Sequence, residues 1–166
     1  RVLKRMGRRW YTAETYVERI ERIVADEKVF GLGADVIVGF PGETDDDHLA
    51  TMNLVERLPF TSLHVFRYSE RPGTSAMRLS DRVGSAAIDS RSADLRELVA
   101  NKERAYRASR IGGAADVVAI TSREGLTEDY LSVDITDANV GRRERFDARL
   151  STRGDALVAS PIPTPA

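Results

Sequence analysis

Cysteine is absent from the 166 residues of this chain. Disulfide bonds are therefore excluded, as are thiolate zinc sites and iron–sulfur clusters held by the chain's own cysteines. No apolar run is long enough to span a membrane and no signal peptide is visible, so we expect a soluble, cytoplasmic protein. The formal net charge is only −1, which gives no strong overall attraction to nucleic acid or membranes.

Apolar residues, in contrast, make up 42% of the chain, which is enough for a real core. The length suits one medium domain, or a small domain with an appendage. The chain starts with Arg1 instead of methionine and opens directly into RVLKRM. We therefore expect a segment that begins inside a larger protein.

Helices and strands alternate in the pattern of the first 111 residues. Helices are predicted over 14–28, from an N-cap at Thr44 to Pro59, and over 88–110, because apolar residues recur there at helical spacing. Strands are predicted over 32–40 and 62–69. The first is almost uninterruptedly apolar, which is typical of a strand buried on both faces of a parallel sheet. The order implies βαβ units, but two strands are too few for a complete α/β domain, so part of the sheet is expected to be missing.

A different pattern follows Gly112 and Gly113, where short strands alternate with turns and no helical stripe is present. Strands are predicted over 115–121, 130–136 and 144–150, with turns over 123–129, 137–141 and 151–155. We therefore predict a small antiparallel β-barrel over residues 112–160, followed by a disordered tail over 161–166.

The stretch DVIVGFPGET, at the end of the first strand, is the first candidate site. Ligands of α/β sheets bind beyond the carboxyl ends of the strands, and glycine allows the backbone to approach a ligand closely. The three aspartates that follow argue against a phosphate at the next helix start. A flat apolar group such as adenine, packed against Val38 and Phe40, suits these residues better than a phosphate does. A purely structural turn without a ligand explains the stretch as well as an adenine site.

The second strand is expected to end beside the first, which would add hydrogen-bonding groups from Tyr68 to Arg71 to the same rim. Nothing in the sequence fixes the spacing of Glu43 and Glu70 as paired carboxylates. His64 is interpreted as an ordinary strand residue, and neither a nucleophilic triad nor metal-ligand spacing is found.

Arginines also gather near the end of the chain, where they are expected on one hairpin. They are Arg142, Arg143, Arg145, Arg149 and Arg153. A solvated strand with scattered arginines explains them better than an RNA contact does when only composition is considered.

Four stretches together resemble the radical S-adenosylmethionine methylthiotransferases, enzymes that add a methylthio group to tRNA adenosines or to a ribosomal-protein side chain. They are VLKRMGRRWYT, DVIVGFPGET, HVFRYSERPGTSA and GLTEDYLSV, which occur in the family's order and spacing over residues 2–158. The sequence LHVFRYSERPGTSAM is most similar to those of the branch that modifies N6-threonylcarbamoyladenosine next to the tRNA anticodon. Isopentenylated adenosine and a ribosomal-protein aspartate are the alternative substrates.

The resemblance implies an α/β fold, the C-terminal portion of a radical SAM (βα)6 partial barrel over residues 1–111, followed by an RNA-binding TRAM barrel over 112–160. It also implies S-adenosylmethionine and 4Fe-4S clusters as cofactors of the parent protein. The implied partner is the anticodon region of tRNA, with no membrane contact and a monomeric state.

Site residues follow from the resemblance by position. The implied contacts to S-adenosylmethionine are Ile37, Val38, Gly39, Phe40, Phe66 and Tyr68, with Glu43 bracing the loop. The implied contacts to substrate or RNA are Arg8, Arg9, Arg71, Thr74, Tyr130, Arg143 and Arg145.

The chain departs from the family in two places. The segment MGRRWYT is one residue longer than the usual form, which leaves open whether Trp10 or Tyr11 takes the place of the family tyrosine. The Cys-x3-Cys-x2-Cys motif, whose cluster cleaves S-adenosylmethionine to a radical, is missing. We therefore expect the chain alone to be inactive, with no catalytic or metal-binding residue of its own. The alternative from another functional class is a non-catalytic RNA-binding module.

Overall fold

The computed structural model describes residues 1–137 and 139–163. Two compact units are present: the first comprises residues 1–28 and 32–103, and the second comprises 29–31 and 104–166. No helix in these described residues is long and apolar enough to cross a membrane.

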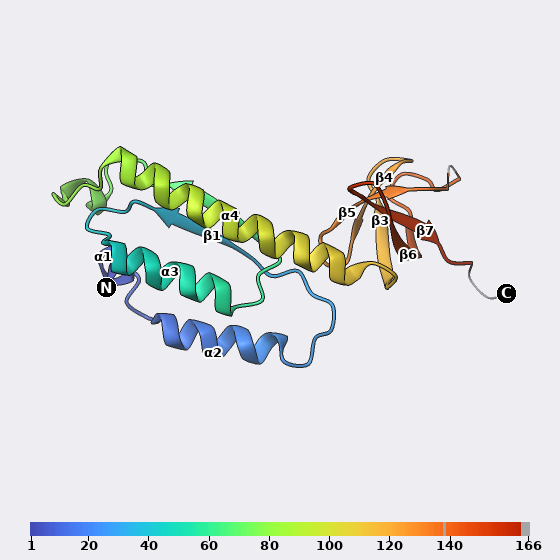
Figure 1. Cartoon of the computed structure of the whole chain (residues 1–166), viewed down its shortest axis with the longest axis horizontal. Coiled ribbons are helices and arrows are strands. Elements are labelled where there is room, and N and C mark those ends of the chain that lie inside the picture. Colours follow the sequence, from blue (N-terminus) through green and yellow to red (C-terminus); the bar gives the residue numbers. More distant parts are fainter. Residues whose placement is uncertain (138, 164–166) are drawn as a thin grey trace. The chain divides into compact units, whose positions relative to one another are not determined.

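The first unit is an α/β arrangement with a two-stranded parallel sheet. Its elements are α1 (Val2–Arg5), α2 (Ala13–Val24), β1 (Gly33–Val38), α3 (Asp45–Arg57), β2 (Ser62–Arg67), the 3-10 helix η1 (Ser75–Arg78) and the first part of α4 (Ser85–Arg110). Helices α2, α3 and α4 run alongside strand β1 (Figure 1). The predicted α/β order and the parallel pairing are confirmed, whereas a partial barrel is not shown.

The helix starts follow from capping chemistry. Thr44 caps α3 through the N–H of Asp47, and the Asp47 carboxylate accepts from the N–H of Thr44. Thr12 caps α2 in the same reciprocal way with Thr15. Both motifs satisfy donors that the first helical turn leaves free. The predicted N-cap at Thr44 is therefore confirmed.

One face of the sheet carries the core of the first unit. The core consists of Val17, Val38, Val55, Leu58, Phe60, Leu63, Leu95 and Val99, contributed by three helices, both strands and the approach to β2. The opposite face is exposed, as shown by the alternating burial of β1 and β2. The prediction of a strand buried on both faces is therefore wrong, because all the covering helices lie on one side.

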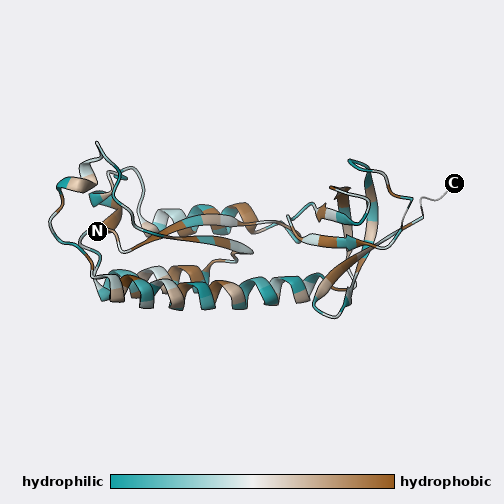
Figure 2. Cartoon of the chain, turned by 90° about the horizontal axis from the view of Figure 1, so that it is seen from above, coloured by the Kyte–Doolittle hydropathy of each residue, from teal (hydrophilic) through white to brown (hydrophobic). Residues whose placement is uncertain are grey.

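The second unit holds a closed five-stranded barrel with the strand order β3-β4-β5-β7-β6. Its strands are β3 (Ala114–Ala119), β4 (Glu124–Thr127), β5 (Ser132–Ile135), β6 (Arg145–Arg153) and β7 (Ala156–Pro161). Figure 2 shows hydrophobic residues along the strands of this unit. They supply a core that includes Val117, Leu150 and Leu157. The small barrel is confirmed, with the correction that β5 and β7 pair in parallel.

Two strands of the barrel differ from the prediction. The predicted turn over 123–129 contains β4, where Gly125 lies so close to β3 that an added Cβ would come within 2.7 Å of Val117 Cγ1. Strand β7 extends through Pro161, and the N–H of Ile162 donates to Asp147 O at 2.8 Å. The predicted tail over 161–166 therefore overlaps ordered chain at its start, while residues 164–166 lie outside the described part.

Candidate functional site

The carboxyl ends of β1 and β2 lie side by side and form one rim. Val38 is in register with Arg67, and the N–H of Tyr68 donates to Val38 O at 2.8 Å. The loop after β1 and the loop after β2 therefore start from adjacent positions, as expected for parallel strands.

Gly39 begins the first loop, with a φ of 81° that favours glycine. Its N–H donates to Glu43 Oε2 at 3.0 Å, and Glu43 Oε1 accepts from Arg91 Nη1 at 2.7 Å. The second guanidinium nitrogen of Arg91 donates to Asp45 at 2.7 Å. Glu43 therefore joins the loop to helix α4 through a buried ion pair. The role of Arg91 was not predicted.

The charge of Arg91 is secured by its partners. Burial alone would lower the pKa of this guanidinium, but its hydrogen bonds to Asp45 and Glu43 outweigh burial and raise the pKa above its usual value. Both side chains of the Glu43–Arg91 pair are less than a tenth exposed. The guanidinium of Arg91 therefore stays charged although it is held out of water.

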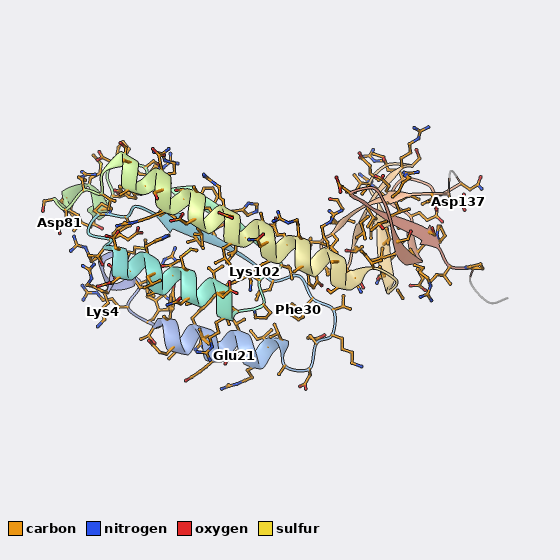
Figure 3. All side chains as sticks on the ribbon, in the orientation of Figure 1. Lys4, Glu21, Phe30, Asp81, Lys102 and Asp137 are labelled. Carbon is orange, nitrogen blue, oxygen red and sulfur yellow. The ribbon has the colours of Figure 1, made fainter. Side chains whose placement is uncertain are left out.

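Arg5, in helix α1, binds the loop that follows β1. Its Nε donates to Pro41 O at 3.1 Å and its Nη2 donates to Asp81 at 3.0 Å; Figure 3 labels Asp81 in the loop before α4. An added Cβ at Gly42 would lie 2.6 Å from the Arg5 guanidinium carbon. The φ of 81° at position 42 therefore favours glycine, and a side chain there would also displace the end of Arg5.

The polar groups at the start of α3 already have partners within the chain. Arg1 pairs with Asp47, which also accepts the hydrogen bonds of the capping motif. Burial raises the pKa of Asp47, but its hydrogen bonds to Thr44 and Arg1 outweigh burial and hold the pKa below its usual value. This agrees with the sequence argument against a phosphate at this helix start.

A cavity of about 240 Å³ opens at the rim. It is lined by Gly39, Pro41, Tyr68, Glu70, Arg82, Val83 and Ile88. The Tyr68 ring packs edge-on against Phe40, with ring centroids 5.3 Å apart. The Tyr68 hydroxyl is buried and finds no hydrogen-bond partner among the described residues. Because such groups are normally satisfied, this hydroxyl is available to a ligand.

The exposed face of the sheet carries a second feature, an apolar pair. Ile37 and Phe66 are in register on β1 and β2 and are 38% and 50% exposed. Val38 and Phe40, in contrast, are buried. The residues predicted to contact S-adenosylmethionine therefore divide into side chains that a ligand can reach and side chains that belong to the core.

Glu43 and Glu70, whose spacing the sequence left open, each bind an arginine. Glu43 binds Arg91, whereas Glu70 binds Arg82. His64 lies on the exposed face of β2, 6.3 Å from Phe66 between ring centroids. These carboxylates are therefore ion-pair partners of arginine.

The predicted RNA-contacting residues of the first unit are exposed, and the cavity lining includes none of them. Arg8 donates to the Tyr11 hydroxyl at 3.3 Å, and Arg9 is exposed. Arg71 and Thr74 close a turn in which the Thr74 hydroxyl donates to Arg71 O at 2.8 Å. Of the two aromatic residues left open by the sequence, Trp10 is exposed and Tyr11 packs toward Tyr16.

In the second unit the arginines of β6 are matched to acceptors. Arg145 pairs with Asp116 and Arg153 pairs with Asp134, while Arg149 donates to Gly112 O. Arg143 has a φ of 67° and makes no side-chain hydrogen bond or ion pair within the described chain. Of the five hairpin arginines, Arg145 and Arg153 are therefore paired with carboxylates, whereas Arg142 and Arg143 have no side-chain partner among the described residues.

Tyr130, the other predicted RNA contact in this unit, is 75% exposed. Next to it, the carboxylate of Asp129 is fully buried and binds Arg110 at 2.8 Å. This buried charge was missed by the sequence analysis.

Iron–sulfur ligands do not exist in this chain. The sequence has no cysteine, and the described residues contain no group of three or more histidine and carboxylate side chains that could hold a metal ion. An exposed apolar pair, a glycine backbone and an unsatisfied hydroxyl lie at the ends of the same two strands, and these groups suit an organic ligand better than a metal ion.

No family model matches the chain. A curated relative is the tRNA-2-methylthio-N(6)-dimethylallyladenosine synthase of Maricaulis maris (strain MCS10), which is 41% identical over 118 residues. The aligned region covers 71% of this chain and 26% of that protein. The chain thus spans about a quarter of the length of the relative that it matches.

Proposed function

We propose that this chain forms part of a radical S-adenosylmethionine methylthiotransferase that modifies adenosine in tRNA. The observation that carries the proposal is the 41% identity to an enzyme named for 2-methylthio-adenosine synthesis in tRNA. The rim geometry supports it, because the cavity at the rim offers backbone, apolar and hydroxyl contacts to a nucleoside. Cluster thiolates would have to come from residues outside this chain.

The substrate supported best is dimethylallyladenosine, the isopentenylated nucleoside in the relative's name. The expectation of N6-threonylcarbamoyladenosine, based on the wording of residues 63–77, receives no support from this comparison. A ribosomal-protein side chain is a further alternative, and the tRNA in the relative's name disfavours it.

S-adenosylmethionine would supply the methyl group and the radical chemistry. In this proposal, Ile37 and Phe66 contact its adenine, because they are the accessible apolar side chains of the exposed sheet face. The Tyr68 hydroxyl and the Gly39 backbone provide polar contacts at the rim. Glu43 and Arg91 do not contact the cofactor, and they hold the loop in place.

The test is expression of the complete coding region without oxygen, with reconstituted clusters and tRNA from a strain that lacks the modification. Mass spectrometry of the nucleosides should show a 2-methylthio derivative of dimethylallyladenosine. A methylthio derivative of the threonylcarbamoyl base would support the alternative branch. Fully loaded clusters with no modified nucleoside would overturn the tRNA substrate.

Phe66→Ala should weaken S-adenosylmethionine binding by about tenfold, because it removes an exposed ring while leaving the core intact. Equilibrium dialysis with the complete protein measures this change. Val38→Ala is the matched control, because it truncates an apolar side chain of the core instead of an exposed one. Val38 is 2% exposed, so this truncation should lower the free energy of unfolding by about 2 kcal/mol. Unchanged cofactor binding in Phe66→Ala would remove the exposed face from the proposed site.

A further inference from the structure

Strand β2 has one edge without a partner strand among the described residues. It pairs with β1 in a two-stranded sheet. The N–H of Tyr68 donates to β1, and backbone groups alternate between the two sides of a strand in a parallel ladder. Leu63, Val65 and Arg67 therefore direct their N–H and C=O groups to the open edge. The position of Arg96 Nη2, 3.5 Å from Val65 O, agrees with this direction.

A cavity of about 330 Å³ lies along this open edge. It is lined by residues 63–66 of β2 and by Arg96, Val99, Ala100 and Glu103 of α4. Alternate residues of a strand face opposite sides of its sheet, so consecutive residues line one cavity along the edge of the strand. The free backbone groups of β2 and one stripe of α4 therefore share a single groove, here called the edge groove.

The open edge of β2 lacks the features that usually keep a free strand edge from pairing. Such edges commonly carry proline, lysine or a bulge, or are covered by another element. The strand SLHVFR contains neither proline nor lysine, and its register with β1 is unbroken. Helix α4 reaches the edge through the long hydrogen bond of Arg96. This edge is therefore suited to lie against another strand.

The α4 stripe in the edge groove carries charges that complement a second copy of the same stripe. Val99 and Ala100 lie midway between Arg96 and Glu103, at a spacing that puts all of them on one helix face. Glu103 is half-buried and has no side-chain partner among the described residues, and Arg96 makes no ion pair there. Carboxylates withdrawn from water are normally paired. A second stripe turned by 180° would place Arg96 opposite Glu103 at both ends.

We propose that the edge groove is a self-association surface, through which two copies of this chain pair around a two-fold axis that passes between Val99 and Ala100. Arg96 of each copy binds Glu103 of the other, and the open edges of β2 lie along the interface. A strand that precedes β1 in a longer chain would be expected beside β1, because successive strands are usually neighbours, and it would leave the edge of β2 free. The proposal does not depend on the tRNA function.

Sedimentation equilibrium of the full chain over a range of protein concentrations tests the proposal. The parent chain should show a monomer–dimer equilibrium that shifts toward monomer as salt is raised. Arg96→Glu and Glu103→Arg should each weaken the dimer by about tenfold or more, because like charges then face each other at both ends of the stripe. The double variant R96E/E103R should restore the dimer, since exchanging the two charges recreates both ion pairs.

Glu97→Arg is the matched control, because Glu97 is exposed on the same helix and does not line the edge groove. It should leave the dimer unchanged. A parent chain that stays monomeric at every concentration would overturn the proposal and agree with the monomeric state that the resemblance implies. A dimer that tolerates both single reversals, or that R96E/E103R does not restore, would overturn this interface. A dimer of this chain but not of the complete coding region's product would show that another segment covers the edge, and would overturn the proposal for that protein.

Discussion

Asp129→Ala should lower the free energy of unfolding of the second unit by about 3–5 kcal/mol. The Asp129 side chain is fully buried and that of Arg110 is only 7% exposed. Removing the carboxylate leaves the guanidinium of Arg110 without its buried partner, and it leaves the Thr127 and Tyr106 hydroxyls without their shared acceptor. Chemical denaturation, with hydrogen exchange to assign the loss to the second unit, measures the change.

The control is Asp134→Ala, which removes the partner of Arg153 on the barrel surface. Both side chains of that pair are substantially exposed, so the loss should stay below about 1 kcal/mol. Similar decreases in the free energy of unfolding in Asp129→Ala and Asp134→Ala would show that burial of the Asp129 charge is not what stabilises the second unit.

The same network predicts how stability varies with pH. Burial raises the pKa of Asp129, but its hydrogen bonds to Thr127 and Tyr106 and the charge of Arg110 outweigh burial and hold the pKa below its usual value. Its contribution is therefore complete above the unfolded pKa of about 4 and is lost as the pH falls through the lower folded value. Burial and Asp129 raise the pKa of Tyr106, so its contribution is complete below about pH 10 and is lost above it. In Asp129→Asn, the acid-side loss caused by this carboxylate should disappear.

Arg91→Ala should lower the free energy of unfolding of the first unit by about 3–5 kcal/mol, because it leaves Glu43 as an unpaired buried carboxylate beneath the rim. Amide exchange should accelerate first at Gly39, whose N–H depends on Glu43. Arg91→Lys should recover only part of the loss, since one ammonium does not reproduce the two-pronged contact with Glu43 and Asp45.

Two controls separate the buried contact from the exposed ones. Asp45 is 98% exposed, so Asp45→Asn should change stability by less than about 1 kcal/mol. Arg57→Ala, which breaks an exposed pair with Glu21, should have a similarly small effect. A small effect of Arg91→Ala, comparable to that of Arg57→Ala, would contradict the bracing role of the Glu43–Arg91 pair.

The elements of the first unit could be predicted because local chemistry determines them. The threonine caps, the apolar stripes and Pro59 each act within a few residues, and α3 was found on these signals. Helix α2 ends at Val24 and not at residue 28, because the apolar stripe stops there and the next residues have no core to contact. Exposure of one sheet face could not be predicted, since it depends on where every helix packs.

The buried ion pairs could be predicted only in part. Arg91 and Arg110 lie on the same stripe of α4 as Leu95 and Val99, and a charged residue in an apolar stripe was the available signal. What the sequence could not show is which carboxylates meet them, because Glu43 is 48 residues away and Asp129 is 19 residues away. The left-handed conformation of Tyr130 was equally hidden, since tyrosine gives no sign of a position that favours glycine.

The parallel pairing of β5 with β7 fixes when the barrel can close during synthesis. Strands β3, β4 and β5 pair with their neighbours in the chain, so they can form a meander early. The closing contact joins Asp134 to Val158 and Ile135 to Ala159 and needs residues that are made more than 20 positions later. The edge of β3 is covered once β6 pairs with it, but β5 keeps an open edge, competent to pair with other chains, until residue 159 has left the ribosome. Strand β7 therefore closes the barrel. The nascent barrel is most exposed to misassembly while the chain between β5 and β7 is being translated.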